Sequence, residues 1–439
     1  MTVSTNGPAG ADEQARRWKK RKIKFVSDVR TSNVDKHIVE DETAVRLCNY
    51  TDVYYHEKIS PDMPFMQGSA TESEIERFGL KKGQVLLTKD SESWEDIAVP
   101  AYVAETIPEV VCGYHLAVIE PDSDEVDGRF LSWLAQSPVL NDQFKLAAKG
   151  VTRFGLSQYA LKNAVVELPP LEYQLKVATF LDRKTAEIDT LIAKKRRLLD
   201  LLAEKRTALI TRAVTKGLDP DAPMKDSGIE WLGEIPAHWE TGIPINYLVK
   251  MSGGMTPSTS NPMYWDGDIP WVSPKDMKRP ELFDSQDHVT ELALSETGLS
   301  LVEPGSVLIV VRGMILAHSF PVAINRVPVV LNQDMKALKV GPRLSSEYFV
   351  FLLRAIADVM LSLVETSAHG TKTLRTDRWK ELVIALPSVD EQKAIVELVK
   401  KMVADLNSLE ETTSRTIEKL EEYRSALITN AVTGQIQVA

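Results

Sequence analysis

The sequence predicts an α+β fold in which two globular domains of the α/β type, arranged as a tandem repeat, are separated by a long antiparallel two-helix coiled coil. Three observations lead to this prediction. The two halves of the chain resemble each other, each half ends in a long amphipathic stretch, and the rest of each half mixes short β-branched runs with helix-like segments. With 439 residues, of which 44% are hydrophobic, the chain can bury more than one core.

The internal repeat is clearest at the end of each half. Residues 168–215 align without a gap on residues 386–433, and about a third of the aligned positions are identical, including Gln174 with Gln392. Fainter parallels continue upstream, between CNYTDV and VSPKDM, LKKGQVLLTKD and VEPGSVLIVVRG, VVCGYHLAVI and VVLNQDMKAL, and RFLSWLAQ and EYFVFLLR. A repeat of about 200 residues is far longer than a solenoid unit, so the chain contains a duplicated module.

The first part of each module has the pattern of a mixed domain. Residues 83–88 and 305–311 are rich in β-branched side chains, are bounded by Gly, Pro, Asp and Ser, and predict strands. Helical periodicity is found in the stretches 129–149 and 345–364. We therefore assign residues 1–168 and 241–386 to the two globular domains.

The second part of each module predicts one long helix. Residues 169–216 have no Gly or Pro after Pro170, which suits a helix start, and residues 387–434 have neither from Val389 until Gly434. Apolar residues lie mostly three or four apart, at Leu175, Ala178, Leu181, Ile188, Leu191, Ile192, Leu198, Leu199, Leu202, Leu209, Ile210 and Val214 in the first stretch, and at Leu398, Val403, Leu406, Leu409, Ile417, Leu420, Leu427 and Ile428 in the second. A helix of about 45 residues is roughly 65 to 70 Å long, too long to bury this stripe on one small domain. We expect the two helices to pack on each other, and a two-fold relation between the halves makes them antiparallel.

Residues 217–240 connect the two modules. This segment, GLDPDAPMKDSGIEWLGEIPAHWE, is dense in Gly, Pro and Asp and carries Trp231 and Trp239. We interpret it as a linker that is partly anchored by these two aromatic side chains.

Composition restricts where the protein works and which partners its surface attracts. A formal net charge of −10 argues against a uniformly basic surface, so any DNA contact must be local or shared with a partner. No apolar stretch of a signal peptide follows the basic run from Arg16 to Lys24, and no window is long enough to span a membrane, so we expect a cytoplasmic protein without a membrane partner. The isolated Cys48 and Cys112 are flanked by apolar residues, which favours reduced core thiols.

Catalytic motifs are missing or incomplete. Asn261-Pro262-Met263-Tyr264 is close to the Asn/Asp-Pro-Pro-Tyr signature of amino-methyltransferases, but Met replaces the second Pro and no Gly-rich loop for S-adenosylmethionine precedes it. The sequence has no GxxxxGK(S/T) loop for nucleotide phosphates, and its seven histidines lack metal-ligand spacing. We therefore predict no catalytic residue, no metal and no cofactor.

The linker and its flanks carry a family resemblance. Residues 217–240 look like the linker of type I restriction-modification specificity subunits, and the resemblance extends to ELPPLEYQ, FLDRKTAEIDTLIAKK, LLAEKRTALITRAVTKG, GDIPWVSPKDM and LPSVDEQ. It covers nearly the whole chain, from about residue 40 to 434. One departure is that the Glu-Gln pair of LPSVDEQ is Tyr173-Gln174 in the first copy.

The resemblance implies a non-catalytic, DNA-reading subunit. The globular parts would be target-recognition domains, each reading one half of a bipartite asymmetric site on double-stranded DNA, and the coiled coil would set the spacer. Two methyltransferase subunits, and two ATP-driven restriction and translocation subunits where restriction is present, would complete the complex. A rod of about 65 Å corresponds to at most roughly 20 base pairs, so the helices would act as a ruler.

Candidate DNA contacts are loop residues able to reach base edges or phosphates. In the first domain they are Asn49, Tyr50, Thr51, Lys89, Ser91, Lys149, Thr152 and Arg153, and in the second Ser273, Lys275, Arg312, Gln333, Lys372, Thr373 and Arg375. Because the two sets differ at nearly all positions, we expect two half-sites of different sequence. The exposed helix faces offer candidate methyltransferase contacts, or pairs within a helix, at Arg196, Arg197, Glu204, Arg206, Arg415, Glu422 and Arg424.

Two other functions stay open on the sequence alone. A stand-alone adenine DNA methyltransferase would bind S-adenosylmethionine as the purified chain. A coiled-coil scaffold that binds proteins and no DNA would suit the acidic composition, and it would show no salt-sensitive, sequence-dependent DNA binding.

Overall fold

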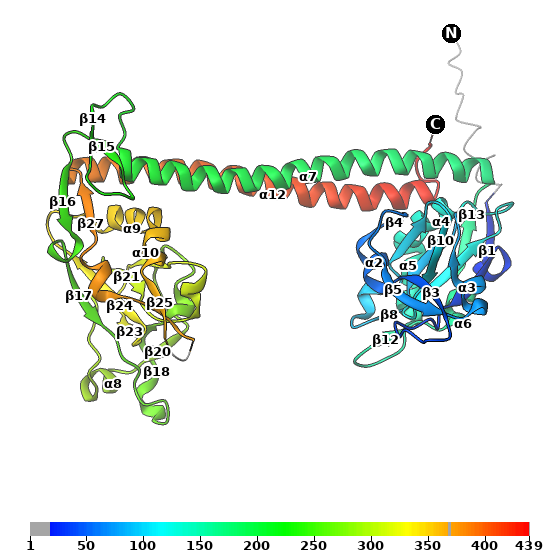
Figure 1. Ribbon diagram of the computed structural model, residues 1–439, viewed down its shortest axis with the longest axis horizontal. Helices are drawn as coiled ribbons and strands as arrows, with labels where there is room; N and C mark the ends of the chain where they lie inside the picture. The colour runs from blue at the N-terminus through cyan, green and yellow to red at the C-terminus, as the bar shows by residue number, and fades with distance from the viewer. Residues whose placement is uncertain (1–17, 368–369, 439) are drawn as a thin grey trace, which may run out of the picture. The chain divides into compact units, whose positions relative to one another are not determined.

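A computed structural model describes residues 18–367 and 370–438 of the chain. The part of the N-terminal basic run before Trp18 lies outside the described residues. The chain forms two compact units: unit 1 combines the residues up to Arg196 with those from Ser414 onward, and unit 2 is Arg197–Thr413. Each unit contains one globular domain and one half of each of two long helices (Figure 1).

The globular domain of unit 1 is built on two main sheets. A five-stranded sheet has the order β2 (Ser27–Thr31), β11 (Leu116–Pro121), β7 (Val85–Thr88), β9 (Pro100–Val103) and β4 (Lys58–Ile59). A four-stranded sheet has the order β5 (Met66–Ala70), β3 (Thr43–Cys48), β10 (Ile107–Cys112) and β6 (Gly79–Leu80). Two short pairs join β1 (Lys19–Lys22) to β13 (Val165–Leu168) and β8 (Asp90–Ser91) to β12 (Phe154–Gly155). The helices are η1 (Ile23–Phe25), α2 (Tyr50–Tyr55), α3 (Glu72–Phe78), η2 (Trp94–Asp96), α4 (Gly128–Gln136), α5 (Pro138–Ala147) and α6 (Gln158–Asn163).

The globular domain of unit 2 has a closely related set of elements. Its five-stranded sheet has the order β17 (Val249–Gly253), β24 (Met335–Val340), β21 (Val307–Val310), β22 (Val322–Asn325) and β19 (Glu281–Leu282), and its three-stranded sheet is β20 (Asp287–Val289), β18 (Trp265–Val272) and β23 (Val330–Leu331). The short pairs are β16 (Glu240–Pro244) with β27 (Val383–Leu386) and β25 (Val364–Thr366) with β26 (Lys372–Leu374). The helices are η3 (Ile245–Tyr247), η4 (Pro262–Tyr264), η5 (Pro274–Asp276), α8 (Glu291–Glu296), η6 (Met314–Ala317), α9 (Ser346–Ala355), α10 (Ala357–Ser362) and α11 (Thr376–Trp379).

The two domains share one topology. Each five-stranded sheet is antiparallel except for its last pair, β4 with β9 and β19 with β22, which is parallel. In the smaller sheets, β3 pairs antiparallel with β5 and parallel with β10, as β18 pairs with β20 and β23. The duplication read from the sequence is therefore present in the strand connections, and the predicted fold class is confirmed.

Two stretches with helical periodicity are each split in the structure. Residues 129–149 form α4 and α5, which break at Ser137 because Pro138 has no N–H to continue the hydrogen-bond ladder. Residues 345–364 form α9 and α10, which meet at Ile356, where the backbone leaves the helical region with φ −103° and ψ 22°.

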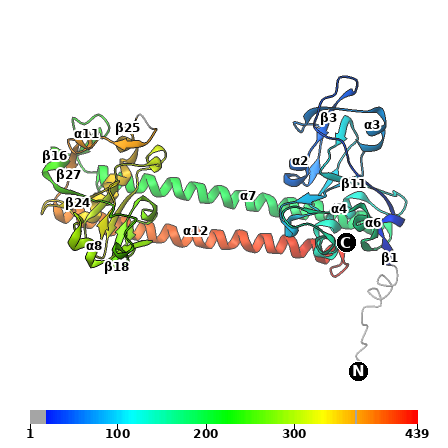
Figure 2. The same ribbon diagram turned by 90° about the horizontal axis from the view of Figure 1, so that it is seen from below.

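The long helices α7 (Leu171–Lys216) and α12 (Val389–Val432) run antiparallel within each unit (Figures 1 and 2). In unit 1, Arg424 of α12 donates to Asp189 of α7 at 2.9 Å. In unit 2, Arg206 of α7 donates to Asn407 of α12 at 2.5 Å. These two contacts join residues at equivalent places in the repeat, so each unit pairs its two helix halves through the same positions.

A buried glutamine joins each long helix to its globular domain. The side-chain amide of Gln174 donates to the carbonyl oxygens of Glu125 and Pro169, and its oxygen accepts from the N–H of Asp127, which caps α4. Gln392 forms the same three bonds in unit 2, with Arg343, Pro387 and Ser345, the residue that caps α9. Both side chains are fully buried, and their identity in the two copies is explained by this shared anchor.

The segment between α7 and β16 is ordered against unit 2. It forms a hairpin of β14 (Met224–Asp226) and β15 (Glu234–Pro236). The ring of Trp239 is buried in the core of unit 2, and its Nε1 donates to Glu391 of α12 at 3.0 Å. Gly217 has a φ of +76°, a left-handed conformation that ends α7 and favours glycine.

Candidate nucleic-acid interface

The predicted contacts of unit 1 begin where β3 ends. Asn49 is the N-cap of α2, and its N–H donates to Asp52 at 2.7 Å in a capping box. Tyr50 begins the helix and Thr51 is exposed on its first turn. Burial raises the pKa of Tyr50, while the neighbouring Ser91 hydroxyl opposes the rise, which places these two predicted residues together.

A second part of the cluster lies around β8 and β12, at the edge of the domain away from α7 in Figure 1. Lys89 precedes β8, and Ser91 pairs with Phe154 of β12. The loop before β12 carries Lys149, Thr152 and Arg153, all exposed. It turns at Gly150, where an added Cβ would lie 1.9 Å from a backbone oxygen, so the exposed basic residues are presented on a tight backbone turn.

Polar contacts bind these parts of unit 1 to each other. Nδ1 of His115 lies 2.9 Å from Asp90 and 3.0 Å from Nη2 of Arg153. The Lys89 ammonium donates to the Ser32 carbonyl at 3.1 Å and lies 4.4 Å from the centre of the Tyr114 ring. Burial lowers the pKa of Lys89. The Lys89 head group is therefore held in place by the domain, whereas Lys149 and Thr152 extend into solvent.

In unit 2 the predicted contacts begin at the equivalent end of β18. Ser273 caps η5 through a capping box with Asp276, at 2.9 Å from its N–H. Lys275 is paired with Asp287 at 2.6 Å. Asn49 and Ser273 thus occupy the same capping position in the two domains. Both residues already cap a helix, so a contact with a DNA base would come in addition to this structural role.

The remaining predicted contacts of unit 2 surround the end of β21. Arg312 forms an isolated bridge with Thr373, and the N–H of Gly313 donates to the carbonyl of Lys372. Gln333 is exposed and its side chain contacts Thr256. The Lys372 ammonium donates to Thr366 at 2.8 Å. Three residues far apart in sequence, Arg312, Gln333 and Thr373, are thereby brought to one edge of the domain.

Arg375 differs from the other basic candidates because carboxylates already surround it. Its guanidinium donates to Asp377 at 2.6 Å and to Glu365 at 3.0 Å. The hydrogen bond from Arg375 lowers the pKa of Asp377 to about 2. A phosphate would have to compete with two carboxylates for this side chain.

The hydrogen bonds fix the register between the two clusters. The N–H of Leu156 donates to the Lys89 carbonyl as the N–H of Leu374 donates to the Val311 carbonyl, both at 2.8 Å. Leu374 therefore stands where Leu156 stands, and Arg375 corresponds to Ser157. Arg375 thus follows the second strand of its short pair, whereas Lys149, Thr152 and Arg153 precede β12.

Two residues of this edge were absent from the sequence-based set. Tyr114 and His115 follow β10 and contact Lys89 and Arg153 respectively. Aligned with the repeat, Tyr114 takes the place of Gln333, which was in the set. Carrying each candidate across the repeat would have found Tyr114, because it occupies the same turn between equivalent strands.

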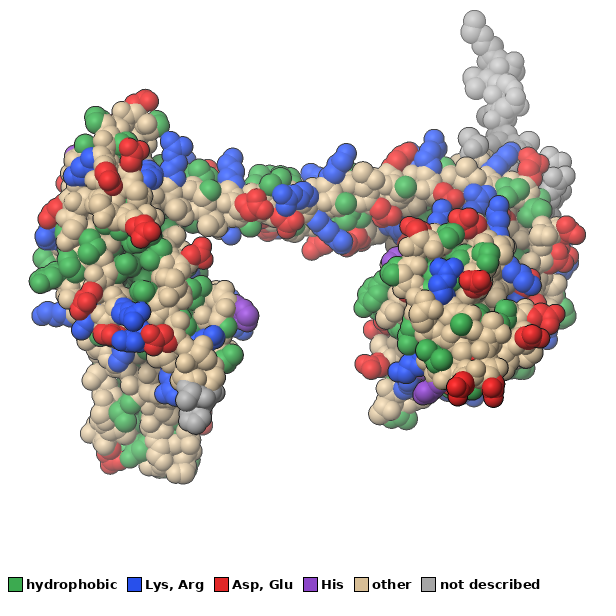
Figure 3. All heavy atoms as spheres, viewed as in Figure 1, with side chains coloured by type: hydrophobic (Ala, Val, Ile, Leu, Met, Phe, Trp, Pro, Cys, Tyr) green, Lys and Arg blue, Asp and Glu red, His purple; other side chains and the backbone are tan. Residues whose placement is uncertain are grey.

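Acidic side chains in the unit 1 cluster have local partners. Asp52 caps α2, Asp96 accepts a hydrogen bond from the Tyr54 hydroxyl, and Asp90 lies against His115. On the face shown in Figure 3, basic and acidic side chains are intermixed on both units. Positive charge is therefore local on this face and does not form a uniformly basic surface.

The candidate partner contacts on the helices divide into two groups. Arg206 and Arg424 are half-buried in the contact between α7 and α12, where Arg206 donates to Glu410 at 2.6 Å. Arg196 pairs across the helices with Glu421 at 2.9 Å, and Arg197 lies 3.8 Å from Glu204 of its own helix. The exposed residues of the set are Arg196, Arg197, Glu204, Arg415 and Glu422.

The segment that resembles a methyltransferase signature is a turn with local bonds. The Asn261 side chain accepts from the N–H of Met263 at 3.1 Å, and the Tyr264 hydroxyl donates to Glu296 at 3.0 Å. The amide and the ring that would hold a flipped base are therefore both used within the loop and α8. In the part of the chain that the structure describes, no helix is long and apolar enough to cross a membrane.

Comparison with known proteins identifies the family. The family model "Type I restriction modification DNA specificity domain" matches residues 15–199 and again residues 236–419. The specificity subunit of the type I restriction enzyme EcoR124I/EcoR124II of Escherichia coli is 32% identical over 210 residues, which is 46% of this chain and about half, 49%, of that relative. The putative MjaX specificity subunit of Methanocaldococcus jannaschii is 24% identical over 84% of this chain and 81% of its own length.

Solved structures show the same fold. A structure titled as the basis of complex assembly and conformational transition of the type I R-M system matches with a TM-score of 0.67 and 15% identity, over 94% of this chain and 97% of that chain. The HsdS subunit from Thermoanaerobacter tengcongensis matches with a TM-score of 0.56 and 17% identity, over 99% of this chain and all of that one, 100%. The family model matches the chain twice, and the two matches together cover most of the chain. The chain therefore belongs to the type I restriction-modification DNA specificity family, as a specificity subunit and not a catalytic one.

Proposed function

We propose that this chain reads a bipartite, asymmetric site on double-stranded DNA in the cytoplasm and carries two methyltransferase subunits, with two restriction and translocation subunits where the system restricts. Residues 1–168 and 241–386 would be the two target-recognition domains, residues 169–216 and 387–434 the helices that set the spacer, and residues 217–240 the linker. One observation carries the proposal: two loop clusters are built on the same strand framework with different side chains.

The loop clusters have the chemistry that direct readout requires. Guanidinium and amide groups recognise base edges, and ammonium groups neutralise phosphates. Exposed Arg153 and Lys149 supply these groups in unit 1, and exposed Arg312 and Gln333 supply them in unit 2. Since the two sets present different hydrogen-bonding groups, the two half-sites should differ in sequence.

The helices offer related docking positions to two copies of a partner. Leu191 of α7 and Leu409 of α12 occupy equivalent places in the repeat, and each is exposed, at 41% and 45%. The exposed charged residues of the candidate set lie on the same two helices. An exposed apolar side chain surrounded by charged residues favours packing against a partner helix over exposure to water.

The two alternative functions have less support. A stand-alone adenine methyltransferase does not fit the family, and the only segment resembling its signature within the described residues is a turn whose polar groups bond locally. The hypothesis of a scaffold that binds no DNA does not explain why the loop clusters expose Arg and Gln side chains. It predicts no salt-sensitive retardation of DNA once the methyltransferase is supplied.

The test of the proposal is methylation-site sequencing with the partner present. The chain is co-expressed with the methyltransferase encoded beside it, the complex is purified, and its methylated DNA is sequenced. We expect a motif of two different blocks with a fixed gap. A palindromic or single-block motif would contradict the assignment.

Variants in one target-recognition domain should change only the DNA block that this domain reads. Arg153→Ala should relax or change only the block read by unit 1, and Arg312→Ala only the other block, each by about 1 to 3 kcal/mol of discrimination. Arg343→Ala, an exposed arginine of unit 2 that pairs with Glu240 outside the cluster, is the matched control and should leave the motif unchanged. A change in both blocks from one variant would argue against independent reading.

A further inference from the structure

Each unit has a cleft between its globular domain and the helix pair. The unit 1 cleft is lined by β4, β9, α4 and α7, and the unit 2 cleft by β19, β22, α9 and α12. The strand registers match, because Lys58 pairs with Tyr102 as Glu281 pairs with Ile324. The two clefts are therefore the same place in the two copies of the module.

In unit 1 the chain itself fills this place. The Arg424 guanidinium donates to Glu57 at 2.6 Å and to Asp189 at 2.9 Å, and it lies 5.8 Å from the ring centre of Trp133. Its side chain is only 17% exposed. The cleft that is left has a volume of about 190 Å³. A carboxylate from the globular domain thus pairs with an arginine of the long helix beside this smaller cleft.

In unit 2 the equivalent carboxylate is missing. Arg206 stands where Arg424 stands, but Pro280, the residue before β19, takes the place of Glu57, the residue before β4. Within the described residues, the Arg206 side chain consequently bonds to α12 alone, at Asn407 and Glu410. The unit 2 cleft has a volume of about 680 Å³, more than three times that of its counterpart.

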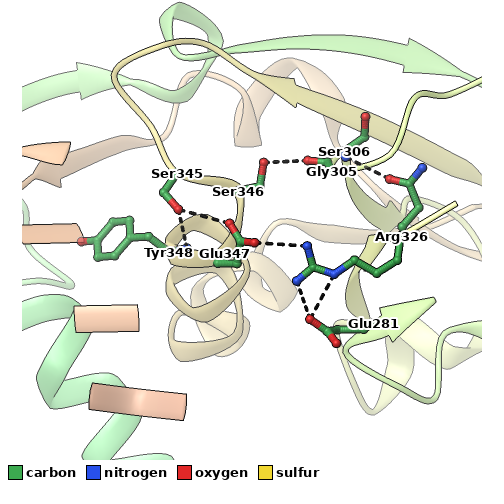
Figure 4. Close-up of polar contacts among 9 residues, drawn as sticks. Glu281, Gly305, Ser306, Arg326, Ser345, Ser346, Glu347 and Tyr348 are labelled. Carbon is green, nitrogen blue, oxygen red and sulfur yellow. Dashed lines mark hydrogen bonds and ion pairs between the residues drawn. The ribbon is translucent and has the colours of Figure 1, made fainter. Parts of the chain in front are cut away.

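Positive charge remains in the unit 2 cleft after its internal pairs are formed. Both lining carboxylates, Glu281 and Glu347, are held by the Arg326 guanidinium, with Glu347 at 3.1 Å (Figure 4). Among the described residues, no carboxylate forms an ion pair with Arg354, whose guanidinium donates to the Val322 carbonyl. Lys400 forms no ion pair within the described residues either, although it lies close enough to Glu347 to interact with it electrostatically. Burial lowers the pKa of Arg354, as expected for a cation without an anionic partner.

The rest of the lining is apolar. Ile210, Ile324, Val350, Phe351 and Val403 provide hydrocarbon surface between the cationic groups. A polypeptide segment that carries both a carboxylate and apolar side chains would satisfy both parts of this lining, whereas a bare phosphate would satisfy only the charges.

We propose that the unit 2 cleft binds an acidic, amphipathic segment of the methyltransferase subunit, with an Asp or Glu taking the position that Glu57 fills in unit 1. The unit 1 cleft, which is smaller and where Glu57 already pairs with Arg424, does not receive such a segment. The two partner copies would then be held differently, one of them with this additional contact. The inference rests on the proposed function, because it names a docking site for the same partner.

The test introduces a carboxylate of the chain itself into the unit 2 cleft. Pro280→Glu places a carboxylate beside Arg206, in imitation of Glu57, and Pro280→Gln is its uncharged control of the same size. Residue 280 is exposed, and its backbone carbonyl, which accepts from the N–H of Ile324, is kept in both variants. Purified methyltransferase is titrated against wild type and both variants, and the copies bound are counted by native mass spectrometry.

We expect Pro280→Glu to bind one methyltransferase copy about tenfold more weakly than Pro280→Gln does, with the other copy unaffected. A second pair of variants removes charge instead: Lys400→Glu should weaken the same copy, and Lys401→Glu, its neighbour outside the cleft, should not.

Equal affinities and equal copy numbers for the glutamate and glutamine variants would overturn the inference while leaving the proposed function intact. The inference would also be wrong if Pro280→Glu weakened the binding of duplex DNA and not that of the methyltransferase, since the cleft would then be a DNA surface. Failure of the wild-type chain to bind any methyltransferase would overturn the proposed function, and this inference with it.

Discussion

At the scale of single residues, the buried side chains of Gln174 and Gln392 each anchor a long helix to its globular domain through three hydrogen bonds. Replacing Gln392 by Leu keeps the volume but leaves the Ser345 N–H and the carbonyls of Arg343 and Pro387 without partners. Unpaired buried groups cost about 1 to 3 kcal/mol each, so with three such groups we expect Gln392→Leu to lower the free energy of unfolding, measured in urea, by about 3 kcal/mol or more.

The control for this substitution is Gln333→Leu, which makes the same chemical change at an exposed position of the same unit. It should alter the unfolding free energy by less than about 0.5 kcal/mol. Equal effects of the two variants would show that the three bonds of Gln392 do not anchor α12.

The two cysteines give a second prediction at this scale. Cys48 and Cys112 are fully buried on neighbouring strands, and burial raises the pKa of Cys112 to about 12 and that of Cys48 well above its usual range. At pH 8 the reactive thiolate is then a very small fraction of each group. We expect neither thiol to react with a maleimide in the native chain and both to react in 8 M urea, as intact mass would report; rapid labelling of the native chain would contradict the burial.

At the scale of elements, the repeat contains a matched pair of arginines in unequal surroundings. Arg424 joins α12 to both α7 and the loop before β4, whereas Arg206 joins α7 only to α12. Arg424→Ala should therefore cost about 1 to 2 kcal/mol and Arg206→Ala less than about 1 kcal/mol. Hydrogen exchange of α4 and β4 is the measurement, and it should accelerate in the first variant alone; similar exchange in both would mean that Glu57 contributes nothing.

The elements also show what the sequence could and could not foretell. The 3.6-residue period and the lack of Gly and Pro predicted both long helices, because periodicity is a property of the local sequence. The apolar stripe predicted less well which side chains are buried. Leu191 and Leu409 belong to the stripe but are exposed, because the contact between two helices is narrower than the core-facing side of a helix in a globular domain. Residues 129–149 were read as one helical stretch, although Pro138 marked the break.

The loop clusters were only partly accessible to the same reasoning. Residue type and repeat position led to Arg153 and Arg312, which the structure places at equivalent edges. They did not reveal that Asn49 and Ser273 cap helices or that Arg375 is enclosed by carboxylates, because those bonds depend on backbone geometry and on tertiary partners. His115 was missed for the same reason, since its contact with Arg153 joins segments that are distant in sequence.

At the scale of the whole molecule, we expect the length of the helix pair to determine the gap between the two recognised blocks. Removing residues 195–201 from α7 and the facing residues 412–418 from α12 takes about two turns from each helix and keeps the antiparallel contacts at Arg206 and Arg424 in register. The helices become about 10 Å shorter, which corresponds to roughly three base pairs. The removed segments contain three candidate methyltransferase contacts, Arg196, Arg197 and Arg415, so native mass spectrometry first establishes that the shortened chain binds both methyltransferase copies. Methylation-site sequencing of that complex should then find the same two blocks with a gap about three base pairs smaller. Shortening α7 alone breaks the facing contacts and should abolish methylation without producing a new gap. An unchanged gap in the doubly shortened chain would mean that something other than these helices sets the spacing.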